Sequence, residues 1–284
     1  MIFDIKTGYF ETNENIIIKN FQVPNSLICL NYCQKLEACQ FLVSNASGCI
    51  IFSFYAQYYK RNDSKSVFYE KLNFKNFGLT NYWPIENGEA RDLVASKNLY
   101  DAFNANYSQN RFGYTNSALS FYDGYIRAPS GIYFETEFTV LAWVRLRNYS
   151  SWQRFFDFGI GRDKDNVYFV LSSPAKEVLA KIYNKGSSIS MRIPHILELN
   201  KWQHIGFTLK NRNMSIFVNG TRQRSTGFTF SGAESIIRHN NFFGKSNWYN
   251  YESPPGNFDC DEIKFFNKAL EDSKIMNERV YGFH

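Results

Sequence analysis

Residues 79–284 alternate between short apolar-rich runs and polar, turn-forming segments. The run 214–218 is a clear case, because apolar and polar residues alternate along it and the pair Asn219-Gly220 follows. Period-two alternation is typical of a β-strand with one buried face, and Asn-Gly is a preferred pair in tight hairpin turns. Further runs of this kind cover residues 118–130, 138–148, 153–162, 166–173, 177–184, 202–211 and 261–270. Many short strands at near-regular spacing predict a two-sheet antiparallel sandwich or jelly roll.

The first 75 residues have a different organisation, with one predicted helix and several predicted strands. The segment 26–38 has the pattern of a short helix, on which Cys29 and Cys33 lie one turn apart. Strand-like runs follow at residues 39–44, 48–59 and 66–72, and the turn-prone sequence Asn-Ala-Ser-Gly separates the first two. Turn-forming residues further along place a domain boundary near residues 73–80.

Four of the five cysteines lie close together near the start of the chain. They are Cys29, Cys33, Cys39 and Cys49. Such a cluster is typical of either a disulfide framework or a metal site, and disulfides fit better because paired C-x2-C zinc ligands are missing and the nearest histidine is His195. Disulfides persist outside the reducing cytosol, so the cluster predicts a secreted or cell-surface protein. Cys260 is left over, either as a buried thiol or as an intermolecular bridge.

Composition supports a folded β-protein and limits the classes of partner that we expect for it. The 284 residues include 28 Phe, 19 Tyr and 5 Trp, and 44% are hydrophobic, which is enough to bury a core lined by aromatic side chains. The formal net charge is +6, but the 32 Lys and Arg are scattered among 26 acidic residues, so no nucleic-acid-binding stripe is predicted. No apolar stretch reaches the roughly 18 residues that span a bilayer. The start of the chain lacks the pattern of a signal peptide, so secretion implies a leader outside this sequence.

Residues 1–75 resemble the PAN/Apple module. The resemblance is carried by the C-x3-C helix, the run Cys39-Gln-Phe-Leu-Val and the run Cys49-Ile-Ile-Phe. It implies a small disulfide-linked α+β module, with bridges from Cys29 to Cys49 and from Cys33 to Cys39. Sequence alone allows three connectivities for four cysteines. The outer disulfide of many Apple domains has no cysteines here, so the module would be a minimal version.

Residues 76–284 resemble the LamG-like jelly roll of the concanavalin A-type lectin/glucanase superfamily. The most specific blocks are Trp202-x-His followed by Val-Asn-Gly, and Asp261-Glu262-hydrophobic-basic followed by Ala-Leu. The resemblance implies a mainly β, two-sheet antiparallel sandwich, in which the Asp261-Glu262 pair begins the last core strand and braces neighbouring backbone. From their strand-like surroundings, Trp143 and Trp202 are expected to be core anchors.

Calcium is the alternative role for acids near the end of the chain, because hard cations collect carboxylate oxygens. Asp123, Asp259 and Asp261 would converge if their loops share one end of the sandwich. No dense Asp/Asn cluster of EF-hand type marks such a site. The sequence therefore predicts no definite cofactor and leaves calcium open.

Catalytic motifs are missing from the sequence. The superfamily's glucanases carry paired glutamates in an E-x-D-x-x-E-like arrangement, as nucleophile and general acid. Glu135 and Glu137 are two apart at the entrance to a strand and lack the third acid. The sequence also contains no G-x-S-x-G motif, P-loop or H-E-x-x-H motif. We therefore expect no enzymatic activity.

The segment 244–259 contains the best candidate ligand-binding residues. They are Asn247, Trp248, Tyr249 and Tyr251. Flat aromatic faces stack on sugar rings, amides bond hydroxyl groups, and loops on rigid scaffolds often bind ligands. The alternative is that these aromatic side chains fold back and cover the end of the sandwich. The turn at residues 149–152, with Tyr149 and Trp152, is a second candidate.

These features predict a non-catalytic extracellular recognition and adhesion protein that binds a carbohydrate or protein ligand through the jelly-roll loops. We expect a glycan or extracellular protein as partner, with no nucleic acid and no membrane span in this chain. The first alternative is a structural extracellular-matrix or coat component that acts by protein–protein contacts. A divergent glycan hydrolase is the second.

Overall fold

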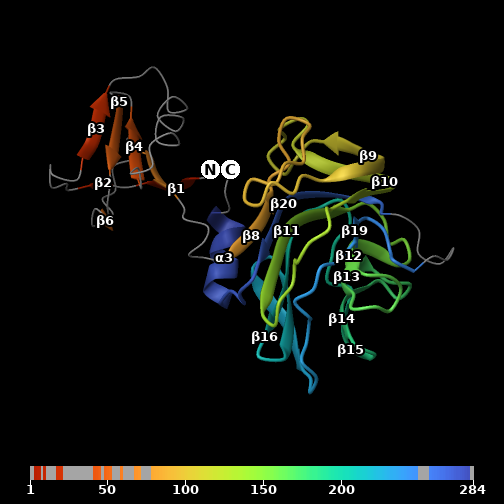
Figure 1. Cartoon of the computed structure of the whole chain (residues 1–284). Helices are drawn as coiled ribbons and strands as arrows, with labels where there is room; N and C mark the ends of the chain where they lie inside the picture. The colour runs from red at the N-terminus through yellow and green to blue at the C-terminus, as the bar shows by residue number, and fades with distance from the viewer. Residues whose placement is uncertain are drawn as a thin grey trace. The chain divides into compact units, whose positions relative to one another are not determined.

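Figure 1 shows the computed structural model of the whole chain. It describes residues 78–248 and 256–279 in full, the backbone of residues 280 and 281, and the backbone of seven short strands between residues 3 and 71. The chain divides into two compact units, one formed by residues 1–73 with 280–284 and the other by residues 74–279. None of the helices in the described part of the chain is long and apolar enough to cross a membrane.

The smaller unit contains an antiparallel sheet in the order β1-β7-β4-β5-β3, and β2 pairs separately with β6. The strands are β1 (Phe3–Thr7), β2 (Tyr9–Phe10), β3 (Ile17–Phe21), β4 (Phe41–Asn45), β5 (Gly48–Phe52), β6 (Tyr58–Tyr59) and β7 (Val67–Lys71). Strands β4 and β5 pair up to Asn45 and Gly48, the two ends of the predicted turn. The runs predicted at residues 39–44 and 66–72 overlap β4 and β7, and the run predicted at 48–59 overlaps β5 and β6.

The cysteine cluster lies outside the part of the chain whose side chains are described. Cys29, Cys33 and Cys39 fall in segments without described structure, and Cys49 lies in β5, for which only the backbone is given. The helix expected at residues 26–38 also lies outside the described residues. The disulfide pairing and the PAN/Apple resemblance therefore stay predictions.

The larger unit is built almost entirely of antiparallel strands. They are β8 (Leu79–Trp83), β9 (Tyr100–Ser108), β10 (Ala118–Arg127), β11 (Phe138–Leu146), β12 (Gln153–Gly159), β13 (Val167–Ser172), β14 (Glu177–Asn184), β15 (Ser187–Pro194), β16 (Trp202–Lys210), β17 (Asn213–Val218), β18 (Thr221–Gly227), β19 (Asn240–Phe243) and β20 (Phe258–Phe266). Helix α3 (Asp272–Tyr281) follows β20. Each strand predicted from alternation is present, so the mainly β fold class is confirmed.

Strand β10 connects the two layers of the sandwich. Its first half pairs with β20 at Leu119 and Ser120, whereas its end pairs with β19 at Ile126 and Arg127. One layer continues as β19-β12-β13-β14-β15 and the other as β20-β11-β16-β17-β18, with β8 also paired to β20. Figure 1 shows these two sets of strands on opposite sides of the larger unit.

Aromatic side chains from both layers fill the space between the sheets. Phe158 of β12 stacks on Phe265 of β20, with ring centroids 5.5 Å apart, and Phe243 of β19 lies 5.2 Å from Phe158. Trp83 is fully buried and donates its indole N–H to the carbonyl of Lys97 at 2.9 Å. This cluster accounts for much of the chain's high phenylalanine content, because ring pairs add favourable contacts to apolar burial.

Trp143 and Trp202 are not core anchors, contrary to the prediction from their strand-like surroundings. Both are only half buried. Trp143 lies 5.3 Å from the ring of His204 and 4.5 Å from the guanidinium of Arg111, and Trp202 lies 5.1 Å from that of Arg145. Alternation along β11 and β16 places these side chains on the outer face, while their sequence neighbours face the core.

Charged side chains and α3 occupy the outer face of the β20-β11 layer. Tyr82 donates to Glu262 at 2.7 Å, and Lys264 pairs with Glu278 of α3 at 2.7 Å. The Asp261-Glu262 pair lies in the middle of β20, where a positive φ at Glu262 marks an irregularity and Asp261 accepts a hydrogen bond from the Glu262 N–H at 2.8 Å. Asp261 thus hydrogen-bonds neighbouring backbone as expected, although the pair lies within the strand rather than at its start.

Candidate functional site

The outer face of the β12-β13-β14-β15 sheet carries an unusual set of side chains. The register aligns two rows across the sheet, and alternation turns both rows away from the core. One row contains Arg154, Val170, Leu179 and Arg192, and the other contains Asp157, Tyr168, Lys181 and Ser190. Aromatic, cationic and hydroxyl groups are thereby brought together on one surface.

Four aromatic rings gather on this face, and we call them the aromatic platform: Trp152, Tyr168, Tyr183 and Trp248. The centroid of Trp248 lies 5.4 Å from that of Tyr168 and 5.8 Å from that of Tyr183. Trp152, Tyr183 and Trp248 are half buried and pack against buried Val170 and Leu179. The rings come from the turn before β12, from β13 and β14, and from the loop after β19, so the fold is needed to assemble them.

The platform tyrosines remain neutral hydroxyls at physiological pH. Burial raises the pKa of Tyr183 to about 12, with Asp163 adding to the effect through a hydrogen bond and its charge. Burial likewise raises the pKa of Tyr168 above its ordinary value. A neutral phenol can both donate and accept hydrogen bonds, which suits contact with hydroxyl-rich ligands.

Three cations border or underlie the rings. The guanidinium of Arg154 lies 4.5 Å from the Tyr168 ring centroid, and that of Arg192 lies 5.7 Å from the Trp152 ring. The ammonium of Lys181 donates to the Tyr183 hydroxyl at 2.6 Å. Cations over ring faces are attracted by the ring quadrupole, so the aromatic and charged parts of this surface support each other.

The predicted ligand residue Asn247 has a structural role. It is 6% exposed, and its backbone and side-chain nitrogens each donate to the Asp157 carboxylate at 2.9 Å. Burial raises the pKa of Asp157, although Arg154 and these hydrogen bonds act in the opposite direction. Asn247 therefore fixes the loop to β12 and is not available to a ligand, which corrects its assignment as a contact residue.

The other predicted ligand residues do not all lie on the aromatic platform. Trp248 lies on the aromatic platform, over the outer face of the sheet rather than at the end of the sandwich. Tyr249 and Tyr251 lie outside the described residues. Trp152 of the second candidate turn also joins the platform, whereas Tyr149 donates to the Leu197 carbonyl at 2.9 Å and packs against the core. Tyr168 and Tyr183 were not singled out from the sequence.

The three predicted calcium ligands do not come together as a metal site. Asp259 is buried and is paired with Arg145 at 2.8 Å and with Arg147, while Asp261 faces Arg111 at 3.6 Å. Asp123 is exposed. No group of three His, Cys, Asp or Glu that could hold a metal occurs among the residues the structure describes. Asp259 already has two arginine partners, and Arg111 lies beside Asp261.

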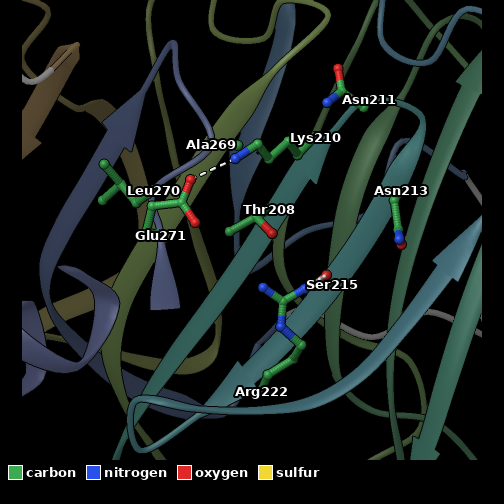
Figure 2. A pocket seen from close by; sticks show the side chains of 9 residues that line it. All are labelled: Thr208, Lys210, Asn211, Asn213, Ser215, Arg222, Ala269, Leu270 and Glu271. Atoms are coloured by element: carbon green, nitrogen blue, oxygen red, sulfur yellow. Dashed lines mark hydrogen bonds and ion pairs between the residues drawn. The ribbon is translucent and has the colours of Figure 1, made fainter. Parts of the chain in front are cut away.

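A separate hollow of about 280 Å³ lies on the other layer, beside the segment that leads into α3 (Figure 2). Its lining consists of Thr208, Lys210, Asn211, Asn213, Ser215, Arg222, Ala269, Leu270 and Glu271. Lys210 pairs with Glu271 at 2.5 Å, and Arg222 donates to Ser215 at 2.8 Å. Its charges are paired and no aromatic ring lines it, so it offers less to a sugar than the aromatic platform does.

Comparison with known proteins places this fold in a family. The sequence model of the concanavalin A-like lectin/glucanase superfamily matches residues 93–276. The chain is a member of the concanavalin A-like lectin/glucanase superfamily. The resemblance to this superfamily, predicted from the sequence blocks around Trp202 and Asp261, is therefore confirmed. No curated protein sequence matches the chain.

Solved structures share the superfamily fold at low sequence identity. Domain 4 of AbnA, an extracellular arabinanase from Geobacillus stearothermophilus determined in complex with arabinotriose, is 18% identical with a TM-score of 0.57, covering 70% of this chain and 97% of that domain. The binding domain of Paraclostridial Mosquitocidal Protein 1 is 15% identical with a TM-score of 0.52, and the match covers 71% of this chain and 52% of that domain. The binding domain of botulinum neurotoxin serotype D/C is 13% identical with a TM-score of 0.57, and the match covers 72% of this chain and 52% of that domain. The match thus spans about half of each toxin binding domain.

Proposed function

We propose that this protein is a non-catalytic recognition protein that binds glycans through the aromatic platform. The observation that carries the proposal is the convergence of half-buried Trp152, Tyr183 and Trp248 on a sheet face that α3 does not cover. Ligand sites combine apolar and aromatic surface with a few placed polar groups. The platform has this composition, with Lys181, Ser190 and Arg192 as its polar neighbours.

The acids of this face are committed to structural contacts, which supports a binding role over catalysis. Asp157 accepts hydrogen bonds from Asn247 and Asn166, and Glu177 pairs with Arg192 at 3.0 Å. Retaining and inverting glycosidases need two carboxyl groups poised on either side of the scissile bond. Glu135 and Glu137 precede β11 in the other layer and are remote in the strand order from the platform.

We also propose an extracellular location and a disulfide-linked PAN/Apple-like N-terminal module. Both proposals are supported by the spacing of the four clustered cysteines and by the strands found at the predicted positions in β4, β5 and β7. A solved structure that shares the fold, domain 4 of an extracellular arabinanase, was determined in complex with arabinotriose.

A glycan array with matched variants tests the proposal. Trp248→Ala and Tyr183→Ala should each weaken binding by about tenfold or more, because they remove stacking surface. Tyr114→Ala is the control, since Tyr114 is 66% exposed on the β9–β10 hairpin, away from the platform. An array without binders, or binding that both platform variants leave unchanged, would contradict the proposal. Release of new reducing ends from a bound glycan would contradict the absence of catalysis.

A second function by protein–protein contact is favoured by the β9–β10 hairpin. Tyr100, Phe103 and Tyr122 are 46%, 49% and 57% exposed. Contiguous exposed apolar surface marks interaction sites in soluble proteins. If the array is empty, binding to immobilised extracellular-matrix extract that Tyr100→Ser and Phe103→Ser abolish would support this structural role.

A further inference from the structure

Arg154 is a buried cation with two guanidinium nitrogens that make no hydrogen bond to the described residues. Its side chain is 5% exposed, and neither Nε nor Nη1 has a hydrogen-bond partner within the described part of the chain. The nearest carboxylate oxygen, Oδ2 of Asp157, lies 3.7 Å from Nε, beyond hydrogen-bond distance. Buried charges without full compensation are costly. The protein therefore maintains an incompletely paired positive charge beneath the aromatic platform.

Asp157, the counter-ion of this guanidinium at 3.7 Å, also has several neutral hydrogen-bond donors. Its oxygens already accept hydrogen bonds from the Asn247 backbone, from the Asn247 amide and from the Asn166 amide, each at 2.9 Å. These amides are neutral, so they satisfy the acceptor positions of the carboxylate without adding positive charge. The Asp157 carboxylate is therefore shared between Asn247, Asn166 and the more distant Arg154.

Two more cations lie on the same face within reach of solvent. Lys181 follows Tyr168 in the cross-strand row. Arg192 lies at the β15 end of the Arg154 row, where it pairs with Glu177 at 3.0 Å and keeps 46% of its side chain exposed. The pKa of Lys181 is lowered by burial and by the positive charges of Arg192 and Arg154, while Asp163 acts in the opposite direction. Like charges are thus held close enough to repel each other.

We infer that the aromatic platform selects glycans that carry carboxylate groups, such as uronic acid chains, over neutral glycans of the same shape. The inference rests on the proposed glycan-binding function and adds the class of sugar. The sugar rings lie against the platform, and the carboxylates face Lys181 and Arg192. Arg154 adds positive potential from below the rings. Hydrogen bonds between ions are stronger than those between neutral groups, particularly on a partly desolvated surface.

A matched pair of ligands separates charge from shape. Isothermal titration calorimetry compares oligogalacturonate with its fully methyl-esterified form, which keeps the sugar skeleton but removes the charge. The wild-type protein should bind the acid form about tenfold more tightly at low salt, and raising the salt should reduce this preference. Lys181→Gln and Arg192→Gln should abolish the preference while keeping residual binding of the ester. Lys268→Gln, an exposed lysine in the other layer, should change neither affinity.

A glycan array tests whether other carboxylated glycans bind in the same way. It includes uronic acid, sialylated, sulfated and neutral glycans. Carboxylated binders whose signal falls in Lys181→Gln but not in Lys268→Gln support the inference. Binders that are only neutral, only sulfated, or unaffected by Lys181→Gln overturn it and leave the glycan-binding function standing. An array with no binder at all overturns the proposed function itself, so the two failures are distinguishable.

Discussion

Asn247 donates two hydrogen bonds to the Asp157 carboxylate and a third to the Asp157 carbonyl, although 90 residues separate them in the chain. Its backbone N–H bonds Oδ2 and its amide bonds Oδ1, both at 2.9 Å, and the same amide also donates to the Asn240 carbonyl at 3.0 Å. Asp157 lies in β12 and Asn247 in the loop after β19. This contact therefore fixes the loop to the sheet and determines where the next residue, Trp248, lies on the aromatic platform.

Asn247→Ala should lower the free energy of unfolding by about 2 kcal/mol, because a buried carboxylate loses the amide donor that it bonds. Glycan binding should fall with it, since Trp248 loses its anchor. Urea unfolding measures the first effect and titration calorimetry the second. Asn213→Ala, at an exposed residue, is the control. Equal effects of the two substitutions on stability would contradict the structural role of Asn247.

Phe158→Ala should be among the most destabilising single changes in the larger unit. The ring is fully buried between the layers and contacts Phe265 and Phe243. Truncation of a buried Phe leaves a cavity and costs about 3–5 kcal/mol. Phe103→Ala removes a ring that is 49% exposed and stacks on Tyr125, so it should cost less than about 1.5 kcal/mol. Chemical denaturation of both variants compares them, and a similar loss in each would contradict the two-layer core.

Alternation predicted most strands that have a buried face, whereas the exposed strand β9 was not predicted. The strand β17 alternates along its length and is followed by the Asn219-Gly220 turn, as expected. The strand β9 was missed because almost all of its side chains are exposed, so no period of two is imposed on its sequence. Positive φ values at Asp101 and Asn104 interrupt it further.

The candidate site was only partly predictable, because alternation does not reveal which face of a strand the fold covers. Tyr168 and Tyr183 alternate like core residues, but they lie on the outer face of the sheet, where Trp248 packs against them. Trp143 and Trp202 were wrongly expected inside for the same reason. Asn247 has an amide that suits a ligand equally well, and its partner Asp157 is too far away in sequence to be inferred. Trp248 was identified because its loop combines aromatic and amide side chains.

The stability of the larger unit should depend on the ionisation of Asp261. Burial, followed by the charge of Glu262, raises the pKa of Asp261 from its ordinary 3.8 to about 8. The folded state therefore retains a proton that the unfolded state releases, and the associated stability is present at low pH and lost as pH rises from about 4 to about 8. Thermal unfolding should show the wild type losing stability relative to Asp261→Asn over this range.

The difference between these two proteins isolates Asp261, because other titrating groups are common to both. His204, whose pKa is lowered to about 3 by burial and by nearby cations, gives the opposite slope below about pH 6.5 in each protein. Asp123→Asn serves as the control, because Asp123 is exposed and lies outside this cluster. A stability difference between the wild type and Asp261→Asn that does not change with pH would show that Asp261 is ionised in the folded protein throughout.

Peptide mapping should distinguish Cys260 from the four clustered cysteines. Cys260 is fully buried, and burial raises the pKa of its thiol well above the ordinary value, so iodoacetamide should leave it unmodified in the native protein. Labelling should occur only after denaturation. Mass spectrometry without reduction should find Cys29 linked to Cys49 and Cys33 linked to Cys39. Zinc in the purified protein, with all four cysteines reactive after chelation, would instead favour the metal alternative and remove the argument for an extracellular location.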